Sequence, residues 1–329
     1  MTIRRGLAVV LVLATLGAGA VALYLVALPP VPPAGARLVV REGDTLSAIA
    51  TRLARLGVIR SALAFRLQAR FAGRDRRLQP GEYRFDAALG TRAILDLLAT
   101  GGVHAEVTIP EGLTVREVAA LLERGGYGSA ESFLCVGDDP DFLLAAGVPG
   151  PQLEGFLFPD TYRLTQVMTT SEILGLMVRR FHERFDAQHH RQAIARSMSV
   201  NEVLTLASIV EKESGVAAER PLIAGVFYNR LRLGMPLQSD PTIIYAIPNF
   251  NGDLTRADLA RPSPYNTYQV TGLPPGPIAN PGLAAIDAVL DPTDTQYLYF
   301  VSKNDGSHAF AATLAEHNHN VARYQKLAR

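Results

Sequence analysis

An uncharged, largely apolar run from Gly6 to Leu28 places the strongest limit on what this chain can fold into. About 20 such residues span the hydrocarbon core of a bilayer as a helix. Arg4 and Arg5 come directly before the run, and basic residues of this kind stay on the cytoplasmic side. We therefore expect a cytoplasmic tail over residues 1–5, a transmembrane anchor over residues 6–28, and the rest of the chain outside the cytoplasm.

A cleavable signal peptide is the alternative interpretation of the same run. Ala18-Gly19-Ala20 has the small side chains of a cleavage site. The apolar run continues beyond that site, which favours an uncleaved, single-pass anchor in the cytoplasmic (inner) membrane. Prolines at positions 29, 30, 32 and 33 end the helix and stiffen a Pro-rich linker over residues 29–36. With either interpretation the folded part is exported to an extracytoplasmic (periplasmic) location.

The composition indicates globular domains and argues against nucleic acid as a partner. Hydrophobic residues make up 48% and charged residues 19% of the 329 residues, enough for a sizeable core. The 32 basic and 31 acidic residues leave a formal net charge of +1, whereas a phosphate-binding surface normally shows a basic excess. The one cysteine, Cys135, excludes an internal disulfide and a multi-cysteine metal site, and we expect it to be an inert core residue.

Residues 37–105 have the pattern of a small βααβ unit. The β-prone run Leu38–Val40 precedes Asp44 and Thr45, either of which can cap a helix whose apolar residues recur at helical spacing until Gly57 ends it. Further elements are expected in this order: a helix over Arg60–Arg70, a strand over Gly81–Phe85 and a short helix over Thr91–Thr100.

The same local pattern occurs twice. Glu-Gly-x-Thr, followed by apolar residues at helical spacing, begins at Glu42 and again at Glu111, 69 positions later, and Gly57 is matched by Gly126. Either the unit is duplicated, or Gly and Thr recur because a turn and a helix cap need them. The first copy, from Val40 to Ala50, resembles the LysM module, a βααβ unit that binds glycans containing N-acetylglucosamine. That resemblance implies either glycan binding or a spacer.

Residues 106–329 are expected to form a larger mixed α+β domain, in which residues 106–150 are a connecting α/β subdomain. The aromatic segment Glu154–Tyr162 is predicted to be a strand or loop, and Ser171–Phe185 an amphipathic helix. Another helix begins at Ser199, which forms a capping box with Glu202. The predicted fold class is thus α+β: an N-terminal transmembrane helix, the small unit and this domain.

The helix that begins at Ser199 carries two carboxylates near its end. Its apolar stripe is Val203, Leu206, Ala207 and Val210, and its opposite face is Thr205, Ser208 and Lys212. Glu211 and Glu213 lie on the flanks between these faces, and spacing alone does not choose between them. A carboxylate there loses solvation and meets the negative end of the helix dipole, so its pKa rises, as a general acid requires. Alternatively, both are ordinary solubilising residues at a helix end.

Other groups of polar residues point less clearly to chemistry. His317 and His319 are separated by one residue, but the segment is predicted to be helical, where such residues diverge, and no HExxH motif is present. We expect no metal and no cofactor, and a structural or substrate-facing role for His308. Ser208 and Lys212 have the i, i+4 spacing of a serine–lysine pair, but no Ser-x-x-Lys motif accompanies them.

Polar and aromatic loops stiffened by proline follow, and such loops suit a sugar chain through amide hydrogen bonds and ring stacking. Seven motifs of the chain then carry a resemblance to a known family. They are Glu154-Gly-Phe-Leu-Phe-Pro-Asp-Thr-Tyr162, Leu206-Ala-Ser-Ile-Val-Glu-Lys-Glu213, Phe227-Tyr-Asn-Arg-Leu231, Leu237-Gln-Ser-Asp-Pro-Thr242, Tyr265-Asn-Thr-Tyr268, Gly272-Leu-Pro-Pro-Gly-Pro-Ile278 and Tyr297-Leu-Tyr-Phe300. Over essentially its whole length the chain resembles the endolytic murein transglycosylases of the MltG/YceG type.

The resemblance implies an enzyme that cuts the glycan strands of peptidoglycan without water. Glu211, the first Glu of Glu-Lys-Glu, corresponds to the catalytic acid, which protonates the glycosidic oxygen. The C6 hydroxyl of the same muramic residue then closes on C1 and leaves a 1,6-anhydro end, and the acid later serves as the base. Candidates to hold the glycan are Asn229, Gln238, Asp240, Tyr265, Asn266 and Tyr268, and Glu213 and Glu154 are candidates for supporting roles.

The expected partners follow from the same resemblance. They are nascent peptidoglycan glycan strands, the cytoplasmic membrane through the N-terminal helix, and the peptidoglycan synthases of the divisome or elongasome. Cleavage within nascent strands implies termination of glycan elongation. The alternative is a membrane-anchored scaffold that binds peptidoglycan through the LysM-like unit and cuts nothing.

Overall fold

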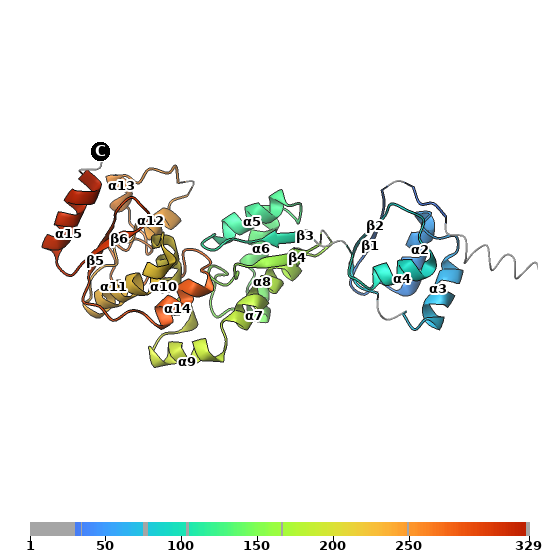
Figure 1. Ribbon diagram of the computed structural model, residues 1–329, viewed down its shortest axis with the longest axis horizontal. Coiled ribbons are helices and arrows are strands. Elements are labelled where there is room, and N and C mark those ends of the chain that lie inside the picture. Colours follow the sequence, from blue (N-terminus) through green and yellow to red (C-terminus); the bar gives the residue numbers. More distant parts are fainter. Residues whose placement is uncertain are drawn as a thin grey trace, which may run out of the picture. The chain divides into compact units, whose positions relative to one another are not determined.

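The computed structural model describes residues 30–33, 35–74, 78–102, 105–165, 167–248 and 250–326 (Figure 1). The predicted tail (1–5) and anchor (6–28) lie outside the described residues. Within the described part, no single helix is long and apolar enough to cross a membrane. The helices α9 (Ala187–Ala195) and α10 (Val200–Glu213) pass that test only as a pair, bent by 91° at the break between them.

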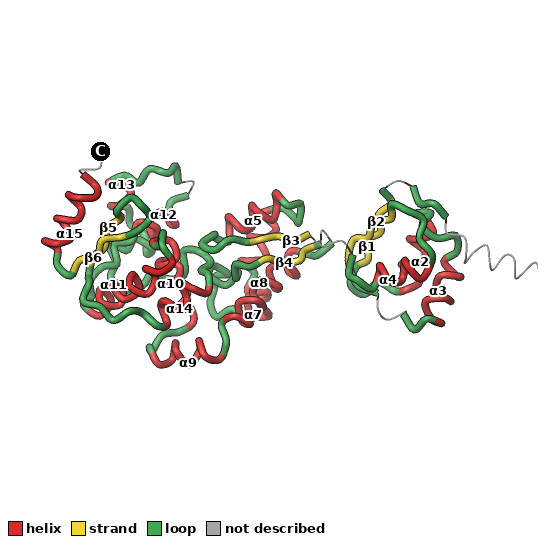
Figure 2. Tube along the Cα trace, in the orientation of Figure 1, coloured by secondary structure: helices red, strands yellow, loops and turns green. Residues whose placement is uncertain are grey.

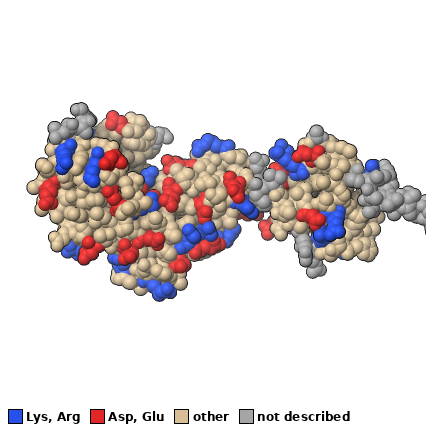
Figure 3. Space-filling model, viewed as in Figure 1, with Lys and Arg blue, Asp and Glu red and all other residues tan. Residues whose placement is uncertain are grey.

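The described chain is a mixture of helices and three small two-stranded sheets, so the predicted α+β class is confirmed at this level (Figure 2). It divides into two compact units. One unit ends at Val107 and includes Tyr162–Met168, and the other consists of Thr108–Thr161 and Thr169–Arg329. On the face drawn in Figure 3, acidic and basic side chains are interspersed on both units.

The first unit has the predicted order of strand, helix, helix and strand. Its elements are β1 (Ala36–Val40), α2 (Leu46–Arg55), α3 (Ala62–Phe71), β2 (Gly81–Phe85) and α4 (Thr91–Leu98). The strands are antiparallel, with Leu38 opposite Tyr83, and both of these side chains are buried. Alternate residues of each strand face the helices, as expected of a sheet with one covered face.

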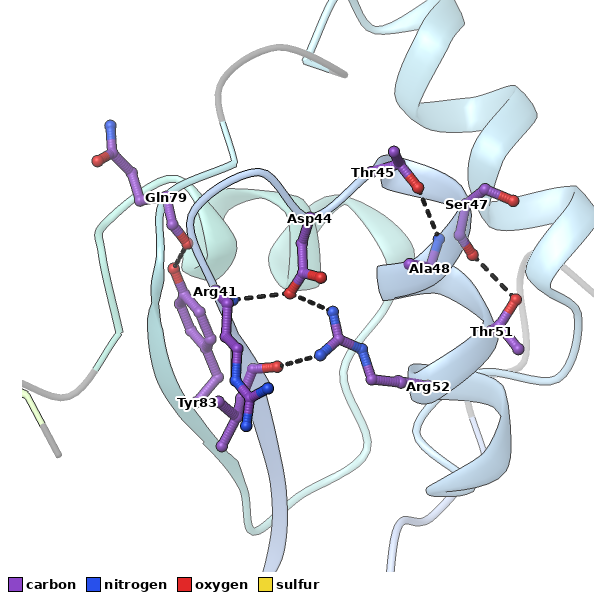
Figure 4. Close-up of polar contacts among 10 residues, drawn as sticks. Arg41, Asp44, Thr45, Ser47, Ala48, Thr51, Arg52, Gln79 and Tyr83 are labelled. Atoms are coloured by element: carbon purple, nitrogen blue, oxygen red, sulfur yellow. Dashed lines mark hydrogen bonds and ion pairs between the residues drawn. The ribbon is translucent and has the colours of Figure 1, made fainter. Parts of the chain in front are cut away.

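The turn after β1 is held by polar contacts within the unit (Figure 4). Asp44 accepts a hydrogen bond of 2.7 Å from the Arg41 backbone N–H and forms an ion pair with Arg52. The Arg52 guanidinium also donates to the Val39 carbonyl at 2.8 Å, and Thr45 caps α2. Asp44 and Thr45, the polar residues of the LysM-like motif, are therefore engaged in local structure.

The repeated pattern has the same local geometry in both copies. Gly43 and Gly112 have φ angles of 82° and 76°, values that favour glycine. The second copy leads into α5 (Val115–Arg124), whose cap Thr114 matches Thr45. Its preceding strand β3 (Ala105–Thr108) pairs with β4 (Thr161–Leu164). Turn and cap geometry thus recur, and whether a unit was duplicated stays open.

Three helices, α6 (Ala130–Gly137), α7 (Pro140–Ala146) and α8 (Thr170–Arg184), follow in this region. The predicted helix over Ser171–Phe185 is thus confirmed within a residue. The segment from Glu154 to Asp160 is a loop with buried aromatic residues, as predicted, and β4 begins directly after it. Cys135 is exposed, so the expectation of a core cysteine was wrong. It lies on the side of α6 that faces away from the buried Phe133.

The helix α10 is the centre of the second unit. Every residue from Val203 to Val210 is buried, and α11 (Arg220–Arg232) and α14 (Leu283–Leu290) pack against the helix. The face that carries Thr205 and Ser208 is therefore buried, like the apolar stripe. Thr205 donates to the Asn201 carbonyl at 2.7 Å, while Ser208 donates to the Thr205 carbonyl and accepts from the Ile278 N–H. These bonds satisfy the hydroxyls without water.

The remaining elements complete the second unit. They are η1 (Ala217–Glu219), α12 (Asp240–Ala246), α13 (Arg256–Leu259), β5 (Tyr299–Ser302), β6 (His308–Ala311), α15 (Leu314–Val321) and the π-helical turn η2 (Ala322–Lys326). The hairpin β5–β6 lies beside α15 in Figure 1. A Cβ on Gly215, just after α10, would lie 2.5 Å from the Gly306 carbonyl oxygen at the hairpin turn. The hairpin tip therefore rests directly on the end of the helix.

Candidate functional site

Glu211 is held in a network of charges and backbone groups. One oxygen of its carboxylate accepts from the Arg220 guanidinium at 2.6 Å, and the other accepts from the Gly282 backbone N–H at 3.0 Å. The Glu211 side chain is 7% exposed and that of Arg220 12%. Burial raises the pKa of Glu211, against the effects of the Gly282 N–H and Arg220. The same guanidinium nitrogen of Arg220 lies 3.5 Å from a carboxylate oxygen of Glu111. Both oxygens of Glu211 thus have a donor from the protein.

Glu213, two residues later, has different surroundings. One of its oxygens accepts a hydrogen bond of 2.5 Å from the Ser239 hydroxyl. Burial raises the pKa of Glu213 to about 7, and the charge of Asp240 acts in the same direction, while Ser239 and Arg230 oppose it. A carboxyl group with this pKa is protonated for a substantial part of the time at neutral pH. Glu213 can therefore carry the proton that a general acid must donate.

Glu213 opens onto a cavity of about 450 Å³, which we call the Glu213 cavity. Its lining residues are Glu213, Arg230, Leu237, Gln238, Asp240, Tyr268, Tyr299, Phe300, Val301, Ser302, His308, Leu314, His317 and Val321. Aromatic rings beside a few polar groups are typical of a carbohydrate site. Glu211 is not among the lining residues.

Three of the six predicted glycan-binding residues lie in this cavity. Tyr268 donates a hydrogen bond of 2.7 Å to Asp240, and burial together with that carboxylate raises the pKa of the Tyr268 hydroxyl. The Gln238 side-chain oxygen accepts from Arg230 at 3.2 Å, and its backbone has a φ of 54°. That left-handed conformation is uncommon outside glycine, and such strain clusters at functional sites.

The other predicted residues are engaged elsewhere. Asn229 donates to the carbonyls of Thr295 and Tyr297, at 2.7 and 3.1 Å. Asn266 is fully buried and holds its own loop through backbone bonds. Tyr265 donates to Gln152 at 3.2 Å. These side chains support the loops around the site and do not line the Glu213 cavity.

Glu154 is a buried carboxyl away from the cavity, and burial raises its pKa to about 8. It accepts hydrogen bonds from the Val115 backbone N–H, the Asn280 amide and the Tyr245 hydroxyl, at 3.0 to 3.3 Å. The Asn280 side chain also accepts from the N–H groups of Gly155 and Leu157. This cluster connects the start of α5 to the loop before α14, so the role of Glu154 is structural.

Several residues of the cavity were missed from the sequence. Arg230 donates to the carbonyls of Leu298, Pro236 and Leu237 and lies 5.1 Å from the centre of the Tyr299 ring. It therefore joins the hairpin to the loop before α12. Ser239, which donates to Glu213, was likewise not predicted to be a site residue. The signal available for Arg230 was an arginine inside the Phe227–Leu231 motif, on the buried face of α11.

Comparison with known proteins shows to which family the chain belongs. The family model described as the YceG-like family matches residues 38–323. The chain belongs to the YceG-like family. It is 35% identical over 300 residues to an endolytic murein transglycosylase of Bacillus subtilis, covering 86% of this chain and 83% of the relative. It is 32% identical to endolytic murein transglycosylases of two Streptococcus pneumoniae strains, over 86% of this chain and 57% of theirs.

A solved structure of the family is also similar. A crystal structure of a YceG-like protein from Listeria monocytogenes has 33% sequence identity and a TM-score of 0.61, over 86% of this chain and 97% of that chain. The family region also includes the segments that form the Glu213 cavity, since these all lie within residues 38–323.

Three other features do not provide an alternative to this site. Among the described residues, no group of three or more His, Cys, Asp and Glu side chains could hold a metal ion. Lys212 donates to the Gly112 carbonyl at 3.3 Å, and Ser208 is bonded to backbone groups, so the two do not form a pair. A larger cavity of about 590 Å³ has Glu202 as its one carboxylate, and that residue is engaged in capping α10.

Proposed function

We propose that this member of the YceG-like family is an endolytic lytic transglycosylase that cuts the bond between N-acetylmuramic acid and N-acetylglucosamine in peptidoglycan. The relatives that match most of the chain are named endolytic murein transglycosylases. The Glu213 cavity adds the chemistry, because it combines a carboxyl group of raised pKa with aromatic and polar walls. That combination is the observation on which the proposal rests.

We assign the acid to Glu213 in preference to Glu211, the residue favoured by the sequence. A general acid must reach the leaving oxygen and must carry a proton. Glu213 lines the cavity and its pKa is about 7. Glu211 lies outside the lining. Burial raises its pKa too, but both of its oxygens already accept hydrogen bonds, from Arg220 and from the Gly282 N–H. Its proposed role is to fix the end of α10, so that Glu213 keeps its direction.

The proposed reaction uses one acid and no water. Glu213 donates its proton to the glycosidic oxygen, and positive charge develops at C1 of the muramic residue. The Asp240 carboxylate, held by the Tyr268 hydroxyl, stabilises that charge from the cavity wall. The C6 hydroxyl then closes on C1, gives up its proton to a basic group in the cavity and leaves a 1,6-anhydro end. Ordinary glycosidases instead need a second carboxylate to activate water or to attack the sugar.

The location and partners belong to the same proposal. The uncharged run Gly6–Leu28 after Arg4 and Arg5 supports a single-pass anchor with the catalytic unit outside the cytoplasm. A site beside the membrane suits nascent strands and their synthases, whose elongation the cut would terminate. The strand–helix–helix–strand order supports a LysM-like role for the first unit, as a docking face or spacer.

Mass spectrometry of the products tests the proposal. The full-length chain and its Glu213→Gln and Glu211→Gln variants are incubated with purified peptidoglycan. Anhydromuramyl ends from the wild type, with loss of about 10²-fold or more in rate for Glu213→Gln, would support it. We expect Glu211→Gln to retain cleavage. Reducing ends would indicate a hydrolase. Binding without cleavage by any of the proteins would indicate a scaffold.

A further inference from the structure

His308 lies in the wall of the Glu213 cavity and is held by a carboxylate that the proposed reaction does not use. Its Nδ1 is 2.7 Å from one oxygen of Glu219, and its backbone N–H donates to the other oxygen at 3.1 Å. The side chains are 9% and 18% exposed. The imidazole also has edge contacts with the rings of Phe300 and Phe310. Its orientation is therefore fixed from several sides.

The Glu219 contact decides which nitrogen of His308 carries the proton. An ionised carboxylate only accepts hydrogen bonds, so Nδ1 must be the donor. In the neutral ring Nε2 then has a free lone pair and is the nitrogen left for a molecule in the cavity. A carboxylate behind an imidazole also stabilises the imidazolium that forms when Nε2 takes up a proton.

A second imidazole in the same cavity, that of His317, has the opposite hydrogen-bonding role. His317 stacks on the Tyr299 ring at 5.2 Å, and its Nδ1 is buried with no hydrogen-bond partner among the described residues. A buried N–H without an acceptor is costly, so the proton belongs on Nε2. Burial, together with the charge of Arg230, lowers the pKa of His317. The His317 ring is therefore a neutral donor, whereas His308 is an acceptor.

We propose that His308, oriented by Glu219, is the group that accepts the proton of the attacking C6 hydroxyl. This inference rests on the proposed transglycosylase reaction. The bond between O6 and C1 forms, the O6 proton goes to Nε2 of His308, and the bond from C1 to the leaving oxygen breaks as Glu213 gives that oxygen its proton. The imidazolium then returns a proton to the Glu213 carboxylate through solvent, so both groups regain their starting states.

Rate measurements on the full-length chain test the inference with a matched control. His308→Ala should lower kcat by about 10²-fold or more, the range typical of a general base. Added imidazole should restore part of that rate, because the vacated space admits the free base. His317→Gln, the control in the same cavity, should mainly raise KM. Glu219→Gln should lower kcat less than His308→Ala, and imidazole should not rescue it.

The pH dependence of kcat/KM gives a second readout. The titratable and charged groups that face the cavity besides His308 are Glu213, Arg230, Asp240, Tyr268, Tyr299 and His317. His308→Ala should change the shape of this pH profile, whereas His317→Gln should leave it unchanged. Wild-type rates in His308→Ala, or a loss that imidazole does not restore, would overturn the role of His308. Reducing ends from the wild type would instead overturn the transglycosylase proposal itself.

Discussion

Replacing Glu213 by Gln is expected to stabilise the folded chain at pH 8 while it abolishes cleavage. The pKa of Glu213 rises from 4.5 to about 7 on folding, mainly through burial. Between these values the folded state binds more protons than the unfolded state, so the free energy of unfolding falls as pH rises. At about 1.4 kcal/mol per pKa unit, ionised Glu213 destabilises the fold by about 3 kcal/mol at pH 8.

The amide introduced by Glu213→Gln would be neutral at every pH and would keep an oxygen to accept the Ser239 hydroxyl. The variant should therefore match the wild type near pH 4.5 and exceed it by up to about 3 kcal/mol at pH 8. For a unit of this size that corresponds to roughly 6 to 12 °C in Tm. Urea and thermal unfolding, followed by far-UV circular dichroism at both pH values, measure the difference. Glu154 titrates over a similar range in both proteins, so its contribution cancels in the difference between their free energies of unfolding.

Glu202→Gln is the matched control because it makes the same change at the other end of α10. Hydrogen bonds from Ser199, first from its backbone N–H and then from its hydroxyl, lower the pKa of Glu202. Its stabilising effect is present above the unfolded pKa and is lost as pH falls through the folded one. Glu202→Gln should therefore be less stable than the wild type at pH 8, whereas Glu213→Gln should be more stable. A difference between Glu213→Gln and wild type that is the same at pH 5 and pH 8 would refute the reasoning from burial.

Three further substitutions probe the surroundings of the site. Ser239→Ala removes a hydrogen bond that lowers the pKa of Glu213, so the alkaline limb of the pH–rate profile should move to higher pH; an unmoved limb would contradict the assignment of the acid. Asn280→Ala leaves buried N–H groups unpaired and should lower the free energy of unfolding by about 1–3 kcal/mol, measured in urea; a loss within error would mean that water replaces the amide. Gly215→Ala places a methyl group 2.5 Å from the Gly306 oxygen, and the displaced hairpin should reduce kcat; full activity would show that the contact is easily relaxed.

Local chemistry allowed the elements of the first unit and the helices α8 and α10 to be predicted. Thr45, Thr114 and Ser199 cap helices in the structure because a cap needs only the next few residues. The strand Gly81–Phe85 has the predicted bounds, since alternating aromatic residues define it without reference to distant parts. Such features depend on neighbours in the chain, which the sequence displays directly.

The choice between Glu211 and Glu213 could not be made in this way. It depends on what each flank of α10 meets, and the answer comes from Ser239, the hairpin β5–β6 and Gly282, all far along the chain. Asn229 and Asn266 are a similar case, because the sequence shows two amides in polar segments but not the distant groups to which they bond. Their backbone partners become visible only when the loops are folded.

The wall of the Glu213 cavity has a consequence for the order in which the chain becomes active. Its lining begins at Glu213 and is completed by His317 and Val321 on α15, far along the chain. A chain still being synthesised has no far wall to this cavity until α15 arrives. The cavity is therefore complete only after synthesis has passed Val321, so the site forms late in the life of a growing chain.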